Sequence, residues 1–291
     1  MTAQVHVTPA TLHGWPLPAP ASDKHGRGVV LVVGGSAGTP GAVRLAAEAA
    51  LRVGCGKVRI ATASSAASRL AALVPEARVY ALEETADGDL AAENGPRIAA
   101  LAEDVDATLI GCGFVDPAAS DALLGAAFPD LRGPVVLDAL ASAYVAGHPE
   151  LGDVQGPSIL TMNPNELAHV LHRDAAEVAG EPGRAVAEQV SACGAVVLLG
   201  GETKLVGVAG GPTYEVTGGG PGLATAGSGD VQAGLVAGLL ARGADPDQAA
   251  VWGAWLHATA GERAAARRGS LGFLARELAP EVPALLDEVA G

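Results

Sequence analysis

The feature that most constrains this fold is a repeated alternation between short, continuous apolar runs and Ala-rich segments with helical spacing. Val29–Val33 is an unbroken run of Val and Leu, which is typical of a strand buried on both faces of a sheet. Gly41–Val53 follows it, and there Leu45, Ala49 and Arg52 recur at intervals of three or four, which predicts a helix. Because parallel strands need helical crossovers, the alternation predicts a mainly parallel, doubly wound α/β fold.

The same alternation continues along most of the chain. Further strands are predicted at Val58–Thr62, Arg78–Leu82, Ala107–Ile110, Val135–Asp138, Ser158–Thr161 and Ala195–Leu199, with a helix at Ser64–Leu73. Lys204–Val208 and Thr213–Thr217 predict a hairpin across the glycines between them. In the helical last third, Asp230–Arg242 forms one helix and Asp245 caps the next. Ligands of such sheets bind beyond the carboxyl ends of the strands, so we expect functional residues directly after the strands.

Net charge and cysteine content limit the classes of binding partner and the cellular compartment that we expect for this protein. The chain has 18 basic and 32 acidic residues and a net charge of −14, which argues against nucleic acid or an anionic membrane as a partner. A small phosphorylated ligand is compatible with this charge, because the backbone N–H groups of a helix N-terminus can hold a phosphate. The three cysteines are scattered without a CxxC motif, and no apolar run approaches the ~18 residues of a membrane span. We therefore expect a cytoplasmic protein.

The chain shows no internal repeat and no linker long enough to divide it into separate domains. Residues 1–21 are rich in proline and polar residues, and they lack the apolar core of a signal peptide. We therefore predict one α/β domain over residues 22–291, preceded by an N-terminal extension of residues 1–21.

The most informative motif is Ala224–Asp230, a run of small residues that ends in an acid and leads directly into an apolar helix. Gly227, Ser228 and Gly229 let the backbone close around an anion, and their N–H groups together with the helix dipole would stabilise a phosphate. Asp230 would lie in the first helical turn, where a carboxylate can accept a proton from a hydroxyl that attacks phosphorus. An ordinary Gly-rich turn explains the same spacing equally well, so the motif alone leaves both interpretations open.

Two other motifs follow predicted strands. Gly34–Ala42 resembles a phosphate-binding loop, but it lacks the Gly-Lys-Ser/Thr ending of a P-loop, and a plain strand–helix connection explains it. Asn163 and Glu166 stand three residues apart at a predicted helix start, a spacing that suits a carboxylate orienting water around Mg²⁺. The same spacing is that of a capping box, which this motif taken alone favours.

Taken together and in order, the motifs of this chain resemble those of one family. They are Ser22–Gly28, Gly34–Ala42, Ala49–Gly54, Ile110–Gly113, Leu137–Ala139, Leu160–Thr161, Glu166, Gly200–Thr203 and Gly222–Asp230. The family is that of the ADP-dependent NAD(P)H-hydrate dehydratases of the ribokinase-like superfamily, and the resemblance covers nearly all of residues 22–289. It implies a three-layer α/β/α sandwich with a mainly parallel central sheet. It also implies a lyase that uses ADP or ATP to convert hydrated NADH or NADPH back to NAD(P)H.

The resemblance implies roles for individual residues. Asp230 matches the catalytic carboxylate, which takes the proton of the substrate's C6 hydroxyl as that hydroxyl attacks the β-phosphate of ADP, and AMP and phosphate are released. The implied substrate-binding residues are Ala42, Gly113, Asn163 and Asp230. The implied nucleotide-binding residues are Leu199, Gly200, Gly201, Glu202, Thr203, Gly227, Ser228 and Gly229. Mg²⁺ is the implied cofactor, with Glu166 acting on it through water.

The sequence departs from the family pattern in three places, and other functions stay open. Leu199 replaces a lysine, Met162-Asn163 replaces Pro-His, and Leu140 replaces an aspartate. Asn163 and Glu166 are close to the pattern of kinases in the same superfamily, so a kinase acting on a sugar or vitamin-like alcohol is the alternative to the dehydratase. A non-catalytic nucleotide-binding protein is a third hypothesis, against which the retention of Asp230 argues. The resemblance further implies a homo-oligomer, for which we expect a tetramer.

Overall fold

The structure is a computed structural model that describes residues 3–148 and 155–290. Its centre is a ten-stranded sheet in the order β1-β10-β9-β8-β7-β6-β5-β2-β3-β4. The strands are β1 (Gln4–His6), β2 (Val29–Val33), β3 (Lys57–Ala63), β4 (Ala77–Leu82), β5 (Ala107–Ile110), β6 (Val135–Asp138), β7 (Ser158–Met162), β8 (Val196–Leu199), β9 (Thr203–Gly207) and β10 (Thr213–Thr217). Only β9 of these described strands runs antiparallel to its neighbours. The prediction of a mainly parallel sheet is confirmed.

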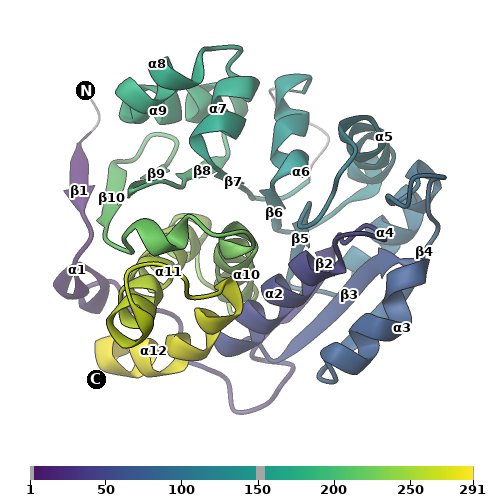
Figure 1. Ribbon diagram of the computed structural model, residues 1–291, viewed down its shortest axis with the longest axis horizontal. Helices are drawn as coiled ribbons and strands as arrows, with labels where there is room; N and C mark the ends of the chain where they lie inside the picture. The colour runs from purple at the N-terminus through teal and green to yellow at the C-terminus, as the bar shows by residue number, and fades with distance from the viewer. Residues whose placement is uncertain (1–2, 149–154, 291) are drawn as a thin grey trace.

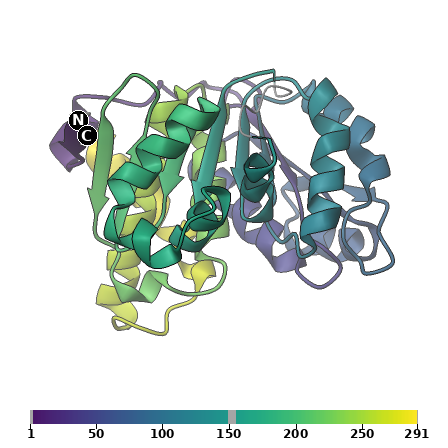
Figure 2. The ribbon, with the colours of Figure 1, turned by 90° about the horizontal axis from the view of Figure 1, so that it is seen from above.

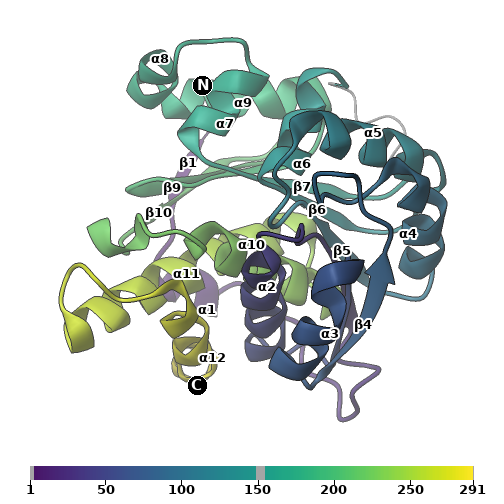
Figure 3. The same ribbon diagram turned by 45° about the vertical axis from the view of Figure 1, so that its right-hand side comes forward.

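Helices cover both faces of the sheet, which lies between two helical layers in Figures 1, 2 and 3. The helices are α1 (Pro9–His13), α2 (Pro40–Arg52), α3 (Ser64–Leu73), α4 (Gly95–Ala102), α5 (Pro117–Ala127), α6 (Leu140–Ala143), α7 (Pro164–Val170), α8 (Ala175–Gly180), α9 (Pro182–Cys193), α10 (Ser228–Ala241), α11 (Pro246–Arg268) and α12 (Val282–Ala290). The helices α2, α3, α10 and α11 pack on one face, and α4, α5, α6 and α9 pack on the other. The fold is therefore the predicted three-layer α/β/α sandwich. None of the helices in the described part of the chain has both the length and the apolar character needed to cross a bilayer.

The predicted elements agree closely with the observed ones. Five of them have the predicted bounds: Val29–Val33, Ser64–Leu73, Ala107–Ile110, Val135–Asp138 and Thr213–Thr217. The continuous apolar runs of the buried strands and the Ala-rich content of the helix fix most of these elements locally. The helix predicted to begin at Asp230 begins two residues earlier, at Ser228, so Asp230 lies in its first turn. The hairpin is also confirmed, with β9 antiparallel to β10.

The N-terminal segment adds an edge strand to the sheet. Residues Gln4–His6 pair in parallel with β10, and the N–H of Val7 donates to Glu215 O at 2.8 Å. The short helix α1 then packs against α12, which brings the two ends of the chain to one side of the molecule (Figure 1). Part of the predicted extension is thus integrated into the fold, whereas the boundary at residue 22 stays a prediction.

The position of α10 is fixed by close packing in the core. This helix is buried almost all round, between α2 and α11. A Cβ atom at Gly234 would lie 2.2 Å from Ala46 O, and one at Gly238 would lie 2.4 Å from Val53 Cγ1. The absence of side chains at these two positions lets α10 and α2 approach closely, so the N-terminus of α10 is held rigidly at the carboxyl ends of the strands.

Candidate active site

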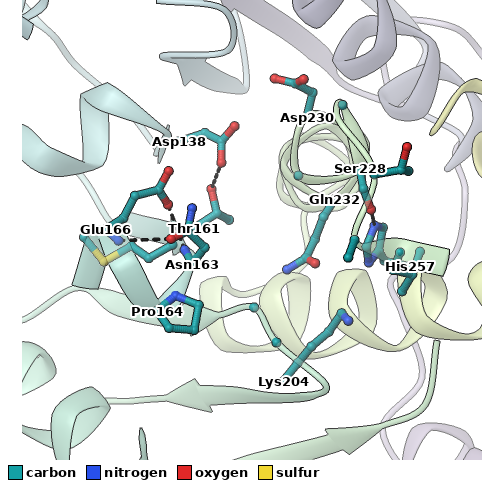
Figure 4. Close-up of a pocket in the computed structure, with 18 of the residues that line it drawn as sticks. Asp138, Thr161, Asn163, Pro164, Glu166, Lys204, Ser228, Asp230, Gln232 and His257 are labelled. Atoms are coloured by element: carbon teal, nitrogen blue, oxygen red, sulfur yellow. Dashed lines mark hydrogen bonds between the residues drawn. The ribbon is translucent and has the colours of Figure 1, made fainter. Parts of the chain in front are cut away.

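A cleft lies beyond the carboxyl ends of β6, β7 and β8, at the N-terminus of α10 (Figure 4). This is the edge of the sheet at which the sequence predicts functional residues. Its volume is about 870 Å³, which is in the range of small-molecule sites. The polar and charged side chains that line it are Asp138, Thr161, Asn163, Glu166, Glu202, Lys204, Thr225, Ser228, Asp230, Gln232 and His257. The cleft therefore joins residues that lie up to about 120 positions apart in the sequence.

The first turn of α10 presents backbone donors to this cleft. Gly227 adopts a left-handed conformation with φ of 88°, and a Cβ there would lie 2.5 Å from Leu45 Cδ1, so only glycine fits. A Cβ at Gly229 would instead meet open space. Among the described residues, the N–H groups of Gly229 and Asp230 have no hydrogen-bond acceptor. These free donors and the helix dipole make this turn suited to hold an anion.

Ser228 forms a hydrogen bond with His257, a residue that the sequence did not predict to be at the site. Its Oγ shares a hydrogen bond of 2.8 Å with His257 Nε2, a residue of α11 (Figure 4). Burial lowers the pKa of His257 to about 3, and the charge of Lys204 acts in the same direction. His257 is therefore neutral at physiological pH. It positions Ser228 and with it the backbone of the anion-binding turn.

An acidic cluster faces the same turn from the sheet side. Asp138, at the end of β6, accepts hydrogen bonds from Thr161 Oγ1 at 2.7 Å and from Cys112 Sγ at 3.4 Å. One ligand atom each from Cys112, Asp138 and Asp230 lies within 4.8 Å of the others. Cys112 is buried, and its thiol connects the two carboxylates.

The crowding and burial of these carboxyl groups raise their pKa values. Burial raises the pKa of Asp230 to about 7, and the Asp138 charge adds to this effect, whereas the Cys112 hydrogen bond opposes it. Burial also raises the pKa of Asp138. The helix N-terminus alone predicts an ionised Asp230 at neutral pH. In the ligand-free protein, desolvation outweighs that effect, and Asp230 ionises near neutral pH, where a general base is most effective.

The Asn163–Glu166 motif forms the capping box that its spacing favours. Asn163 Oδ1 accepts from the N–H groups of Asn165 and Glu166 at 2.9 and 3.0 Å, and Glu166 Oε2 accepts from the Asn163 N–H at 2.7 Å. Both residues nevertheless line the cleft. Burial raises the pKa of Glu166 to about 7, and the Asp138 charge contributes. The cap therefore holds a carboxylate at the cleft wall, while the substrate-binding role of Asn163 stays a prediction.

The predicted nucleotide segment is only partly at the cleft. Gly200, Gly201 and Glu202 line it, but Leu199 is buried beneath it. Thr203 lines a second pocket of about 600 Å³ at the outer edge of the sheet. Successive strand residues point to opposite faces, so where Thr203 turns away, Lys204 turns into the cleft. Sequence reasoning missed Lys204, and the alternation along β9 was the signal that could have found it.

Ala42 and Gly113 lie together, outside the residues that line the cleft. A Cβ at Gly113 would lie 2.9 Å from Ala42 Cβ. The loop after β2 is tied to the loop after β5 by the Ser36 N–H and Thr39 Oγ1, which donate to Gly113 O at 3.1 and 2.5 Å. Because Cys112 reaches Asp138, this pair adjoins the acidic cluster from the side opposite α11.

The donor set of the cleft fits a hard divalent cation. Asp138, Glu166 and Asp230 place carboxylate oxygens at one end of the cleft, with the hydroxyl of Thr161 between (Figure 4). One carboxylate oxygen of Glu166 is used in the capping box, and no bond within the described residues engages the other. Oxygen donors of this kind suit Mg²⁺, which keeps most of its water. The buried Cys112 thiol, whose pKa lies well above its usual value because of burial and the Asp138 charge, is not a Mg²⁺ ligand.

Known proteins share both this sequence and this fold. The family model of NAD(P)H-hydrate dehydratase matches residues 30–284. An ADP-dependent (S)-NAD(P)H-hydrate dehydratase from Xanthomonas campestris is 43% identical over 97% of this chain and 96% of its own. A bifunctional NAD(P)H-hydrate repair enzyme from Moorella thermoacetica is 39% identical, over 89% of this chain and 49% of that protein, so this chain spans about half of it.

A solved structure agrees with these sequence matches. The ADP/ATP-dependent NAD(P)H-hydrate dehydratase of Bacillus subtilis, co-crystallized with ATP/Mg²⁺, has a TM-score of 0.83 and 26% identity, with 97% of each chain covered. This likeness confirms the predicted ribokinase-like fold. With a match to the family model over most of its length and a relative above 40% identity, the chain belongs to the NAD(P)H-hydrate dehydratase family.

Proposed function

We propose that this protein dehydrates (S)-NAD(P)H-hydrate to NAD(P)H at the expense of ADP, releasing AMP and phosphate. The observation that carries the proposal is the position of Asp230. Its carboxyl group, with a pKa of about 7 because of burial, stands beside the free N–H donors of α10 in a cleft of nucleotide size. The 43% identity to the Xanthomonas dehydratase supports the choice of reaction.

In the proposed mechanism each part of the site has one step. The first turn of α10 holds the β-phosphate of ADP through backbone N–H groups, and ionised Asp230 accepts the proton of the substrate's C6 hydroxyl. The hydroxyl oxygen attacks the β-phosphorus, and the bond between that phosphorus and the oxygen bridging to the α-phosphate breaks, which releases AMP. The C6–O bond of the phosphorylated hydrate then breaks with electron donation from the ring nitrogen. Loss of a proton from the neighbouring ring carbon restores the double bond of NAD(P)H.

Mg²⁺ is the cofactor that this arrangement suits, because phosphate charge has to enter a cleft lined by several carboxylates. Glu166 and Asp138 are the residues that would hold the ion through its water shell, and the ion would supply charge neutralisation for the phosphates. Asn163 keeps Glu166 oriented through the capping box. In this proposal the metal role of Glu166 and its capping role coexist.

Chemically prepared NADH hydrate and ADP test the proposed reaction. The absorbance of the dihydronicotinamide ring should reappear with formation of AMP and phosphate in equal amounts. The same base and phosphate site in a kinase would instead yield a stable phosphorylated alcohol. Transfer of phosphate to a sugar or vitamin-like alcohol, with no recovery of the dihydronicotinamide absorbance, would therefore favour the kinase and contradict the dehydratase.

The compartment and the oligomeric state are part of the proposal. We place the enzyme in the cytoplasm because its three described cysteines are free, and we infer a homo-oligomer, with a tetramer expected, from the family resemblance. Cell fractionation tests the compartment, and light scattering coupled to gel filtration measures the mass of the particle. A monomer in solution would overturn the oligomer.

A further inference from the structure

Lys204 is a buried cation without a partner. Its side chain extends from β9 into the floor of the cleft, with 2% of the residue exposed (Figure 4). Among the described residues, none forms a hydrogen bond or an ion pair with its ammonium group. A buried charge without a partner lowers the stability of the folded protein. Such a charge is therefore expected to serve a function, which here is to bind a ligand of opposite charge.

The charges around Lys204 define what it can attract. Of the described residues that line the cleft, Lys204 is the only lysine or arginine. His257 on α11 faces it and is neutral, and the other walls carry the carboxyl groups of Asp138, Glu166, Glu202 and Asp230. Two groups in this part of the protein therefore attract an anionic ligand: the N-terminus of α10 and the ammonium group of Lys204.

These two features lie on different sides of the first turn of α10. Figure 4 shows Asp230 directed away from Lys204, with Gln232 and His257 nearer to the lysine. In the proposed reaction the transferred phosphate has to be beside Asp230. The phosphate that stays with the nucleoside is then the one that can extend toward the cleft floor. A flexible four-carbon stem lets the ammonium group follow it.

We propose that Lys204 binds the α-phosphate of the adenine nucleotide, the phosphate attached to the ribose and retained in AMP. This assignment rests on the proposed function, because that function puts an adenine nucleotide in the cleft. The lysine is a binding residue for substrate and product, and it takes no part in proton transfer. It neutralises the charge that α10 and Mg²⁺ leave on the α-phosphate.

The acid–base behaviour of Lys204 gives the proposal a second observable. Burial lowers its pKa to about 8 in the ligand-free protein, and a bound phosphate has to raise that pKa again. Above pH 8, binding of AMP therefore takes up a proton, and affinity should fall by up to ~10-fold per pH unit. The carboxyl groups of Asp230 and Glu166, with pKa values of about 7, and of Asp138, whose pKa burial also raises, begin to lower the affinity at a lower pH and do so equally in a Lys204 variant, whereas His257, with a pKa of about 3, stays neutral.

Calorimetric titrations with adenosine, AMP and ADP test the assignment. Lys204→Met keeps the apolar stem and removes the charge. It should weaken AMP and ADP binding by about 10- to 100-fold, the range for a charged hydrogen bond, and should leave adenosine binding within about threefold. The additional decline that begins near pH 8 should disappear, leaving only the decline that the carboxyl groups cause. Lys57→Met is the matched control, because Lys57 begins β3 at the opposite end of the sheet and should change none of these values.

Each of the other possible binding results would contradict one part of the proposal. Unchanged AMP affinity in Lys204→Met, or a loss for ADP alone, would overturn the α-phosphate assignment. An equal loss for adenosine would show a contact with the nucleoside instead. Thermal unfolding of the variant checks its fold, and Lys204→Arg, which retains the charge, should recover part of the AMP affinity. If the parent protein repairs the hydrate while Lys204→Met binds AMP normally, only this inference fails. If the parent binds no ADP, the proposed function fails with it.

Discussion

Replacing Asp230 by Asn should reduce turnover and at the same time stabilise the protein at alkaline pH. The substitution keeps the shape of the side chain but removes the proton acceptor. General-base catalysis is worth about 10²–10⁴ in rate, so kcat should fall by that amount. ADP should bind as well as in the parent or better, because one negative charge beside the phosphates is gone.

The stabilisation follows from the pKa of Asp230, which burial raises from 3.8 to about 7. Between these values the unfolded chain is ionised at this position and the folded protein is not. Stability therefore falls as pH rises from about 4 to about 7, by up to ~4 kcal/mol for three pKa units. Asn does not ionise, so the variant escapes this loss. For a chain of this length the gain at pH 8 corresponds to roughly 6 °C in Tm.

Differential scanning calorimetry at pH 4 and pH 8 measures the effect, with steady-state turnover measured on the same samples. The difference in Tm between variant and parent should be larger at pH 8 than at pH 4. Asp104→Asn, which changes an exposed carboxylate in a turn, is the control and should leave turnover unchanged. A variant that is less stable than the parent at pH 8, or that turns over within a few fold of it, would refute the reasoning.

Further predictions concern the carboxylates, the glycines and the metal requirement of the same cleft. Asp138→Asn removes a neighbouring charge, so the acid limb of kcat/KM that reports Asp230 should move down by about one pH unit, and an unmoved limb would contradict the coupling. Gly229→Val should fold normally, because a Cβ there meets open space, yet it should weaken ADP binding in calorimetry by at least tenfold, the loss of a charged hydrogen bond. Gly227→Val should instead lower Tm by several degrees, because glycine alone fits that backbone conformation. Activity should require Mg²⁺, and full activity in EDTA would refute this. Glu166→Gln should raise the Mg²⁺ concentration needed for half activity about tenfold, whereas a normal Mg²⁺ dependence would remove Glu166 from the metal site.

Local sequence determined the elements of the fold. The run Val29–Val33 is apolar throughout and β-branched at four positions, so it can only be stable as a strand covered on both faces. The first-turn position of Asp230 follows from the run of small residues before it. The capping box at Asn163 depends on side chains that reach backbone groups only three residues away. Features of this kind are readable because all the interacting atoms lie in one short segment.

The tertiary structure decided which of these residues share a cleft and what charge they carry. The hydrogen bond between Ser228 and His257 and the approach of Cys112 to Asp138 join residues about 30 positions apart. Lys204 faces the ligand space and Thr203 does not, because pairing with β8 and β10 sets the rotation of β9. The short polar strand β1 has no periodicity of its own and forms only because β10 leaves an open edge. Ionisation near neutral pH at Asp230 arises from desolvation, a property of the packed protein that no run of residues contains.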